Sequence, residues 1–273
     1  MLFNESMKLH TTFRIGGNAD FLFIPDSVEE IVSMVKICKQ LKLPLTVIGN
    51  GSNLIVSDNG IRGVVMKISG GLNKVLFKGN QVIAQAGVLI DDLIHLCSQR
   101  GLGGIECLTG IPGALGGTIY MNGGYTGSID QFVEQVTAIN YNGEIKKFSK
   151  KELNFDYRTS YFHCDKYIII EAILNLQTVD VKVLNNKIKK LKEKRRATQP
   201  IDYPSCGSVF KKVNLKQFAG RQIGGAQVSE MCPAFIINVN NASSEDVLQL
   251  IKSIKVDMGK QLPLEAKIIG GEA

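Results

Sequence analysis

Tryptophan is absent from this 273-residue sequence, and histidine and cysteine are scarce. The three histidines (His10, His95 and His163) form no cluster, and the six cysteines lie far apart without a Cys-x-x-Cys pair. Disulfide frameworks and zinc sites need closer spacing, so we expect buried or incidental thiols and no metal. No segment approaches the roughly 18 apolar residues of a membrane span, and Met1–Leu9 lacks an apolar signal core. We therefore expect a cytoplasmic protein without a membrane partner.

Positive charge is in excess, with a formal net charge of +7, and it is concentrated between residues 187 and 196. Leu184, Ile188 and Leu191 recur there at helical spacing, which predicts an amphipathic helix from about Val181 to Arg196. The simplest interpretation is a solvated helix face. A nucleic-acid patch or a site for phosphate-rich small molecules are the alternatives. Aromatic residues do not interleave with the charges, so base stacking lacks support and we expect no nucleic-acid partner.

The hydrophobic pattern predicts short strands mixed with helices, an α+β arrangement. Pro25 closes a strand at Phe21–Ile24, and Ser27 with Glu30 is typical of a helix start. Ser243 and Asp246 mark the start of another helix in the same way. The remaining strands are predicted at Leu45–Ile48, Val64–Ile68, Gln81–Ala86, Val136–Tyr141, Tyr167–Leu176, Ser208–Lys211 and Ala234–Asn238. The helix capped by Ser243 is predicted to extend from Val247 to about Met258, and a further helix is predicted at Ile90–Arg100.

Two glycine-rich segments are candidates for ligand binding. The loop Gly49–Asn53 follows a predicted strand, where glycines let the backbone N–H groups approach an anion. It matches neither a dinucleotide fingerprint nor a Walker A motif, and a plain tight turn is the alternative. The stretch Thr109–Gly117 contains four glycines and a proline, so ordering it costs much conformational entropy. A ligand held close to this backbone, and to the adjoining Met121–Gly124, would offset that cost. An ordinary cluster of β-turns is the alternative.

Three polar side chains are candidates for chemistry. Arg158 could clamp a carboxylate or phosphate, or form a surface salt bridge. Ser208 follows a glycine but lies in no Gly-x-Ser-x-Gly elbow, which favours a proton donor or hydrogen-bonding residue over a hydrolase nucleophile. The neighbouring Cys206 could be a nucleophile, although no base is evident for it. Glu265 is a lone carboxylate in an apolar stretch, as at many active sites, or an outward-facing strand residue.

Taken in order, these segments resemble the UDP-N-acetylenolpyruvoylglucosamine reductase family, of the shorter type. The resemblance extends over nearly the whole chain, and its motifs are collinear. They are Thr11–Gly17, Gly49–Asp58, Gly110–Gly117, Tyr157–Ser160, Gly207–Lys211, Gly224–Glu230 and Glu265–Gly270.

The resemblance implies an FAD-binding domain of the vanillyl-alcohol-oxidase (PCMH) type followed by a C-terminal α+β substrate-binding domain. The corresponding boundaries are 1–68 with the tail 268–273 for the first FAD-binding lobe, 69–198 for the second, and 199–267 for the substrate domain. The FAD-binding residues would be Gly49, Asn50, Gly51, Ser52, Asn53, Leu54, Thr109, Gly110, Ile111, Pro112, Gly113, Gly116, Gly117 and Asn122.

In that family NADPH reduces the flavin, and flavin N5 then delivers hydride to the enolpyruvyl methylene carbon of a sugar nucleotide. The resemblance implies that Ser208 donates the proton, while Arg158 and Glu265 stabilise the enolic charge that develops on the substrate carboxylate. The excess of positive charge suits a diphosphate substrate and a phosphorylated cofactor. The expected activity is reduction of UDP-N-acetylglucosamine enolpyruvate to UDP-N-acetylmuramate in peptidoglycan precursor synthesis. Oligomeric state is left open.

The sequence departs from the family pattern mainly in the predicted substrate domain. A helix is expected to be missing between Gly220 and Gly224, Lys212 replaces an asparagine, and Cys232-Pro233-Ala234 replaces His-Ala-Asn. A helical segment is also expected to be missing before Asn4. Two alternatives therefore stay open: a divergent paralogue that reduces another nucleotide-linked substrate, and a flavin-binding protein without turnover.

Overall fold

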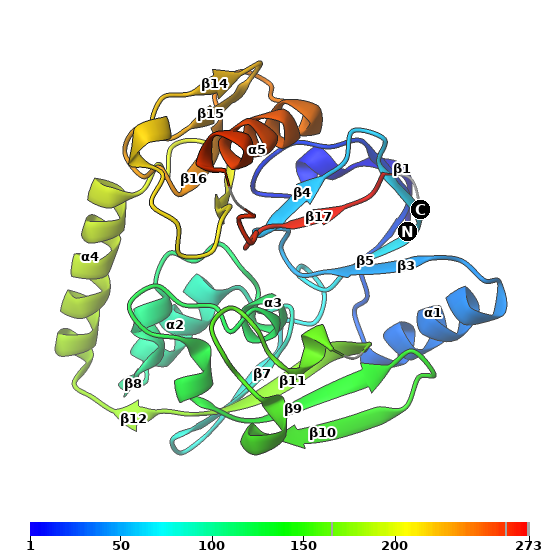
Figure 1. Ribbon diagram of the computed structural model, residues 1–273. Coiled ribbons are helices and arrows are strands. Elements are labelled where there is room, and N and C mark those ends of the chain that lie inside the picture. Colours follow the sequence, from blue (N-terminus) through cyan, green and yellow to red (C-terminus); the bar gives the residue numbers. More distant parts are fainter. Residues whose placement is uncertain (165, 260, 272–273) are drawn as a thin grey trace. The chain divides into compact units, whose positions relative to one another are not determined.

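The computed structural model describes residues 1–164, 166–259 and 261–271, and the chain divides into two compact units (Figure 1). Unit 1 consists of Met1–Leu22, Gly51–Val64 and Lys194–Ala273. Unit 2 consists of Phe23–Asn50 and Val65–Glu193. The chain therefore crosses between the units several times, once inside the candidate loop Gly49–Asn53.

Unit 1 is built from short strands and one long helix. An antiparallel sheet with the order β13-β16-β15-β14 carries α5 on β14 and β15, β1 pairs antiparallel with β2, and β17 pairs parallel with β4. β2 and β5 cross the unit boundary within the sheet β1-β2-β5-β3. The elements are β1 (Leu2–Ser6), η1 (Met7–Leu9), β2 (Asn18–Phe23), β4 (Leu54–Val56), β5 (Ile61–Lys67), β13 (Ser205–Ser208), η6 (Lys216–Phe218), β14 (Gln222–Ile223), β15 (Ala226–Val228), β16 (Phe235–Asn238), α5 (Ser244–Met258) and β17 (Lys267–Ile269).

One apolar core unites these segments of unit 1. Phe13, Ile15 and Ile55 from the N-terminal parts pack in the same buried cluster as Val209 and the inner face of α5. The motif Thr11–Gly17 contributes its large side chains to this core. A Cβ atom on Gly17 would lie 2.1 Å from the carbonyl oxygen of Asp58, so only glycine fits there. Close backbone packing therefore accounts for the glycine at the end of this motif.

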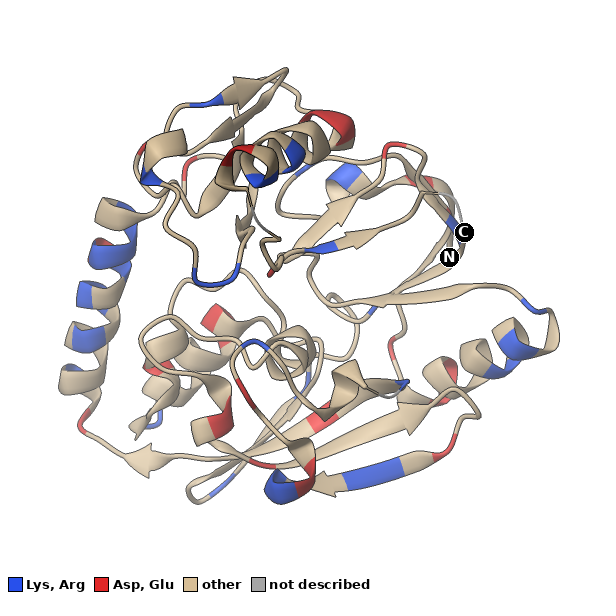
Figure 2. Cartoon of the chain, in the orientation of Figure 1, with Lys and Arg blue, Asp and Glu red and all other residues tan. Residues whose placement is uncertain are grey.

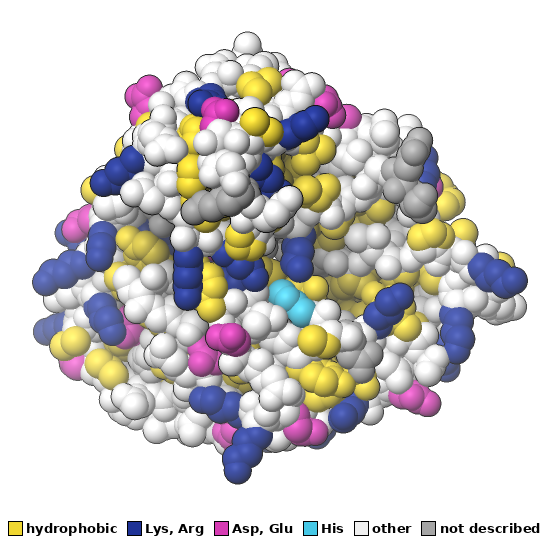
Figure 3. All heavy atoms as spheres, viewed as in Figure 1, with side chains coloured by type: hydrophobic (Ala, Val, Ile, Leu, Met, Phe, Trp, Pro, Cys, Tyr) yellow, Lys and Arg dark blue, Asp and Glu magenta, His cyan; other side chains and the backbone are white. Residues whose placement is uncertain are grey.

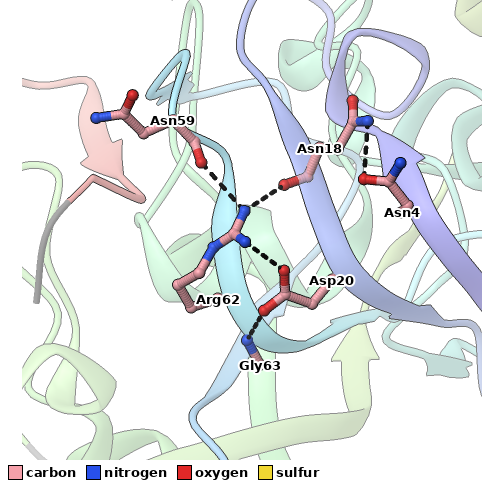
Figure 4. A network of polar contacts seen from close by, with 6 residues as sticks. All are labelled: Asn4, Asn18, Asp20, Asn59, Arg62 and Gly63. Atoms are coloured by element: carbon pink, nitrogen blue, oxygen red, sulfur yellow. Dashed lines mark hydrogen bonds and ion pairs between the residues drawn. The ribbon is translucent and has the colours of Figure 1, made fainter.

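Polar contacts hold the edge of unit 1 together (Figure 4). Arg62 of β5 forms an ion pair of 2.6 Å with Asp20 of β2 and donates to the carbonyl oxygen of Asn59. The other carboxylate oxygen of Asp20 accepts from Gly63 N. Asp58 caps α5, because its two oxygens accept from the N–H groups of Ser244 and Glu245.

Unit 2 contains a five-stranded antiparallel sheet with the order β10-β9-β11-β7-β6, and α3 packs against β7 and β11. Gly103 of β8 approaches α4 so closely that a Cβ atom would lie 2.7 Å from Leu184. The elements are α1 (Val28–Gln40), β3 (Leu45–Ile48), β6 (Val75–Lys78), β7 (Gln81–Gln85), α2 (Ile90–Ser98), β8 (Leu102–Gly103), η2 (Ile105–Leu108), α3 (Leu115–Tyr120), η3 (Ile129–Gln131), β9 (Val133–Asn140), β10 (Ile145–Ser149), η4 (Lys150–Leu153), η5 (Tyr161–His163), β11 (Tyr167–Asn175), β12 (Gln177–Thr178) and α4 (Val181–Thr198), whose last turns belong to unit 1.

Most predicted elements are confirmed, including the helix starts at Ser27 and Ser243. The strand predicted at Ser208–Lys211 is wrong, because β13 ends at Ser208. The helix α3 was not expected within the glycine-rich stretch, where two glycines lower helix propensity. No helix in the described ranges combines the length and hydropathy needed to span a bilayer.

Candidate cofactor and catalytic site

The first half of the loop Gly49–Asn53 lies in unit 2, against the second glycine-rich segment. Asn50 Nδ2 donates to the carbonyl oxygen of Pro112 over 2.8 Å, and a Cβ atom on Gly49 would lie 3.7 Å from Gly117. Buried Ser69 donates to Gly49 O over 3.0 Å and contacts Asn50 Oδ1 over 3.3 Å. Two candidate cofactor segments that are about sixty residues apart in sequence are thus joined, as one ligand site requires.

The stretch Thr109–Gly117 uses only part of its backbone for the fold. The N–H groups of Gly110, Leu115 and Gly116 are hydrogen-bonded to Asp91, Val88 and Ala86 respectively. Ile111 N–H donates to Leu108. Within the described residues, no hydrogen bond uses the N–H groups of Gly113, Ala114 or Gly117. A Cβ atom on Gly117 would meet nothing within 4 Å, so this part of the stretch faces open space.

Two residues outside the stretch fix its beginning, Asp91 by its side chain and Glu106 by its main-chain oxygen. The carboxylate of Asp91 in α2 accepts from Gly110 N over 2.7 Å. The Glu106 carbonyl oxygen accepts from the Thr109 hydroxyl over 2.6 Å and from its N–H over 3.0 Å. Sequence reasoning missed Ser69, Asp91 and Glu106. Glu106 carried a usable signal, because it is a lone carboxylate in the apolar run Ile105–Leu108, like Glu265 in its own stretch.

Arg158 and Asn122, both in unit 2, lie together. Arg158 is half-buried in a left-handed conformation (φ +53°). Its guanidinium donates to Gly124 O over 2.9 Å and to Asn122 O over 3.4 Å. Asn122, also left-handed, donates from Nδ2 to Asp156 O over 3.1 Å. The backbone carbonyls thus orient the Arg158 guanidinium next to the segment Met121–Gly124.

The second half of the loop, from Gly51 to Leu54, lies in unit 1. A Cβ atom on Gly51 would lie 2.3 Å from His10 O and 3.1 Å from the Thr11 side chain. The Thr11 hydroxyl is buried and has no hydrogen-bond partner among the described residues. Asn53 Nδ2 donates to Glu265 O over 3.0 Å, and Asn53 O accepts from Lys267 N over 2.9 Å. The loop is therefore tied directly to the segment that carries Glu265.

Ser208 stands at the end of β13, on an irregularity in the strand. The register with β16 shifts between Ser205 and Ser208, and Gly207 has a φ of +76° with open space around its Cβ position. After Ser208 the chain leaves the β16 ladder and pairs with the segment 263–266, which is why the predicted strand Ser208–Lys211 does not form. Bulges of this kind redirect side chains at active sites. Ser208 is half-buried.

Backbone hydrogen bonds pair the segment of Glu265 with the residues that follow Ser208. Glu265 N donates to Val209 O over 2.8 Å, and Lys211 N donates to Pro263 O over 2.9 Å. Burial, with a smaller contribution from Glu265, raises the pKa of the Cys206 thiol to about 12, against a backbone hydrogen bond that lowers it. A thiol held protonated in this way is no nucleophile. Cys206 is thus a core residue.

The arrangement fits an anionic, flavin-like cofactor better than a metal. The unused N–H groups of Gly113, Ala114 and Gly117, with open space at Gly117, provide donors in unit 2 for phosphate or flavin oxygens. The buried Thr11 hydroxyl beside Gly51 is a further unused donor in unit 1. Among the described residues no group of three or more His, Cys, Asp or Glu side chains could hold a metal ion.

Family models match both parts of the chain. Residues 19–149 match an FAD-binding domain, and residues 199–268 match the C-terminal domain of UDP-N-acetylenolpyruvoylglucosamine reductase. Together with the α+β fold, these matches define a flavoprotein oxidoreductase.

Individual proteins give the same result over the full length. UDP-N-acetylenolpyruvoylglucosamine reductase of Alkaliphilus oremlandii is 41% identical over 100% of this chain and 94% of its own. The protein of that name from Alkaliphilus metalliredigens is 44% identical over 97% of this chain and 92% of its own. The crystal structure of the Thermus caldophilus enzyme is 28% identical, with a TM-score of 0.84 over 97% of each chain. The chain belongs to the UDP-N-acetylenolpyruvoylglucosamine reductase family, whose members use FAD and NADPH in peptidoglycan precursor synthesis.

Proposed function

We propose that this chain reduces UDP-N-acetylglucosamine enolpyruvate to UDP-N-acetylmuramate, with Ser208, Glu265 and Arg158 as its catalytic residues. The observation that carries the proposal is the backbone bond from Glu265 N to Val209 O. This bond holds the segment that carries Glu265 against the residue directly after Ser208, where the bulged strand β13 ends. A proton-transfer site needs its acid and its charge-stabilising groups in one region, and this backbone pairing supports such an arrangement.

The FAD would be held by Gly49–Leu54, by Thr109–Gly117 and by Asn122. The Asn50–Pro112 hydrogen bond and the unused N–H groups of Gly113, Ala114 and Gly117 support this placement. Gly116 acts differently, because a Cβ atom there would lie 2.9 Å from the Ala86 side chain. Its role is close packing of α3. When bound, FAD supplies hydride chemistry: it accepts hydride from NADPH and passes it to the enolpyruvyl double bond.

Side chains of this protein would supply the proton and stabilise the charge that develops on the substrate. Ser208 Oγ donates a proton to the carbon that bears the substrate carboxylate. A serine hydroxyl is a weak acid, so this transfer needs strong stabilisation of the enolic charge that precedes it. Arg158 would bind the substrate carboxylate with its guanidinium, and Glu265 would hydrogen-bond to the same developing group. Groups fixed in advance by backbone hydrogen bonds act without reorganisation at the moment of reaction.

The sugar nucleotide and NADPH are both anionic, and the net charge of +7 favours their approach. We propose that the chain acts in the cytoplasm, where such nucleotides are used. The segment 199–267 would bind the sugar nucleotide, and the two FAD lobes would be 1–68 with 268–273, and 69–198.

Anaerobic absorbance of the purified protein tests the proposal. Addition of NADPH should bleach the flavin bands, and addition of the enolpyruvyl sugar nucleotide should then restore them. Bleaching without recovery would retain the flavoprotein but exclude this substrate, and would favour a paralogue acting on another nucleotide-linked compound. Recovery by the sugar nucleotide but not by UDP-N-acetylglucosamine alone would show that the enolpyruvyl group is the electron acceptor.

A further inference from the structure

An ion pair joins an exposed lysine to a buried carboxylate that precedes the proposed FAD segment in the sequence. The Glu106 side chain, only 6% exposed, contacts Lys187 Nζ of α4 at 2.5 Å. Its other carboxylate oxygen accepts from Gly104 N over 2.6 Å. Through its main-chain oxygen, the same residue holds both the hydroxyl and the N–H of Thr109. Glu106 therefore connects a helix far along the chain to the first residue of Thr109–Gly117.

The packing of α4 explains why Lys187 reaches Glu106. Leu184 is 2% exposed and rests on Gly103, where no Cβ atom would fit. Lys187 lies three residues later and thus on the same helix face. Gly104, next to Gly103, has a φ of +127° and packs against the Phe132 ring. Gly103 and Gly104 let α4 and the turn approach each other closely. This approach brings the ammonium group of Lys187 to the buried carboxylate of Glu106.

The remaining basic residues of α4 behave differently. Figure 2 shows Lys and Arg along much of this helix, and Figure 3 shows their side chains on its surface. Lys190 is exposed and has no ion pair among the described residues. Lys189 faces Glu193 at 4.0 Å with both side chains exposed, a contact of little energetic value. Lys187, in contrast to these two lysines, pairs with a carboxylate that is only 6% exposed.

The electrostatics of Glu106 agree with a fixed, charged carboxylate. Burial alone would raise the pKa of this carboxyl. The hydrogen bonds from Lys187 and from the N–H groups of Glu106 and Gly104, together with the Lys187 charge, outweigh burial and hold the pKa below its usual range. Removal of the lysine would leave an uncompensated buried charge, which is a costly state.

We infer that Glu106 is a positioning residue for the FAD segment and that Lys187 holds its carboxylate in place. The inference rests on the proposed placement of FAD at Thr109–Gly117. Thr109 is fully buried, and its two hydrogen bonds to Glu106 set the direction in which the chain enters that segment. If the carboxylate shifts, the turn at Gly104–Thr109 loosens and the cofactor must order it on binding. Helix α4 thus supports FAD binding through Lys187 without contacting the FAD itself.

Release of FAD from purified holoprotein on dilution, followed by flavin fluorescence, gives the dissociation constant that tests this inference. We expect Lys187→Met to raise the constant about tenfold, a typical coupling between neighbouring sites. Lys187→Arg should stay close to wild type, because the guanidinium can also pair with the carboxylate. Turnover of the variants at saturating FAD should stay near the wild-type rate, with an unchanged KM for the sugar nucleotide.

Lys190→Met is the matched control, since it removes the same charge from the same helix. An equal rise in both Met variants would show a general attraction for phosphate and overturn the inference, as would unchanged FAD binding in Lys187→Met. Gly117→Val, which fills the open space of the segment, should release FAD in any case. If Gly117→Val keeps its FAD, the placement of the cofactor is wrong; if it loses FAD while Lys187→Met does not, only the positioning role fails.

Discussion

The Ser208–Glu265 region of unit 1 and the Thr109–Gly117 segment of unit 2 differ in how they are held. Backbone hydrogen bonds fix the first region, from Glu265 to Val209 and from Lys211 to Pro263. The second also has backbone hydrogen bonds, but side chains add to them through the carboxylate of Asp91 and the amide of Asn50. Where backbone hydrogen bonds hold a region, its side chains are available for chemistry. Where side chains share this role, some backbone N–H groups remain available to bind a ligand.

This difference predicts different sensitivities to substitution. In the Ser208–Glu265 region, deletion of a side chain should remove activity with little loss of stability. In the glycine-rich segment, deletion of a supporting side chain should weaken cofactor binding and leave the chemistry intact. The following experiments separate the two regions, beginning with the largest expected effect.

Ser208→Ala should give the largest loss. General acid catalysis contributes roughly 10²- to 10⁴-fold, so we expect reduction of the sugar nucleotide to fall by about this factor. Bleaching of the flavin by NADPH should remain, because that half-reaction needs no proton from this residue. Stopped-flow absorbance measures the two half-reactions separately.

Ser205→Ala on the same strand is the control for Ser208→Ala. Its backbone, not its hydroxyl, contacts Thr12, so both half-reactions should persist. Full activity of Ser208→Ala would assign the proton to another donor.

Gly207→Ala tests whether the backbone positions Ser208. The φ of +76° costs a residue with a Cβ atom roughly 1–2 kcal/mol of stability, although the space for it is open. A small displacement of a reacting group can cost up to about 10²-fold in rate. We expect a fall in kcat of about tenfold or more, measured by steady-state kinetics, with FAD binding unchanged.

Gly259→Ala supplies the comparison, because Gly259 also has a positive φ (+60°) and open space and ends α5. It should lose similar stability without losing activity. Equal effects of the two variants on kcat would show that the strand irregularity has no positioning role.

How much of this could be predicted from the sequence depends on the kind of contact. Helix starts at Ser27 and Ser243 were predictable because capping is local, and strands such as β11 follow from hydrophobic runs. The end of β13 was not predictable, because it depends on pairing between residues 209 and 265. Nor was α3, whose Gly116 needs Ala86 as a neighbour before its small size becomes an advantage.

The site shows the same division between local and distant contacts. Glycine-rich segments and a lone carboxylate marked candidate positions, and the collinear motifs indicated the family. The supporting residues Ser69, Asp91 and Glu106 were missed. Each acts through a partner distant in sequence, such as Lys187 for Glu106. No local pattern distinguishes Ser69 and Asp91 from ordinary polar residues, whereas the apolar run around Glu106 could have indicated it. The roles of Arg158, Ser208 and Glu265 stay predictions until variants are measured.

Asn50→Ala should have a moderate effect, confined to cofactor binding. Loss of the hydrogen bond to Pro112 O should cost about 1 kcal/mol, or about fivefold in FAD affinity. Flavin fluorescence on dilution measures this, and turnover at saturating FAD should be near normal. Asn142→Ala, which removes an exposed amide paired with Lys39, should bind FAD like the wild type. Tight FAD binding by Asn50→Ala would mean that the two segments need no such link.

Asp246→Asn should have the smallest effect and should depend on pH. The pKa of Asp246 is lowered, chiefly by the hydrogen bond from the Ser243 N–H, against burial and with help from Gly225 N–H. A lowered folded-state pKa means that the charge stabilises the protein above the unfolded value of 3.8 and loses this effect as the pH falls through the folded value.

The charge of Asp246 is favourable at the N-terminus of α5, so the asparagine variant should lose about 1 kcal/mol near neutral pH. Its stability should converge with that of the wild type in acid, once the wild-type carboxyl is protonated. Urea unfolding at both pH values measures the difference. Asp257→Asn, at an exposed ion pair with Arg221 near the other end of α5, should change stability little at either pH. If both variants lose the same stability at neutral pH, the cap is not what fixes this helix, and the support of unit 1 must come from its apolar core alone.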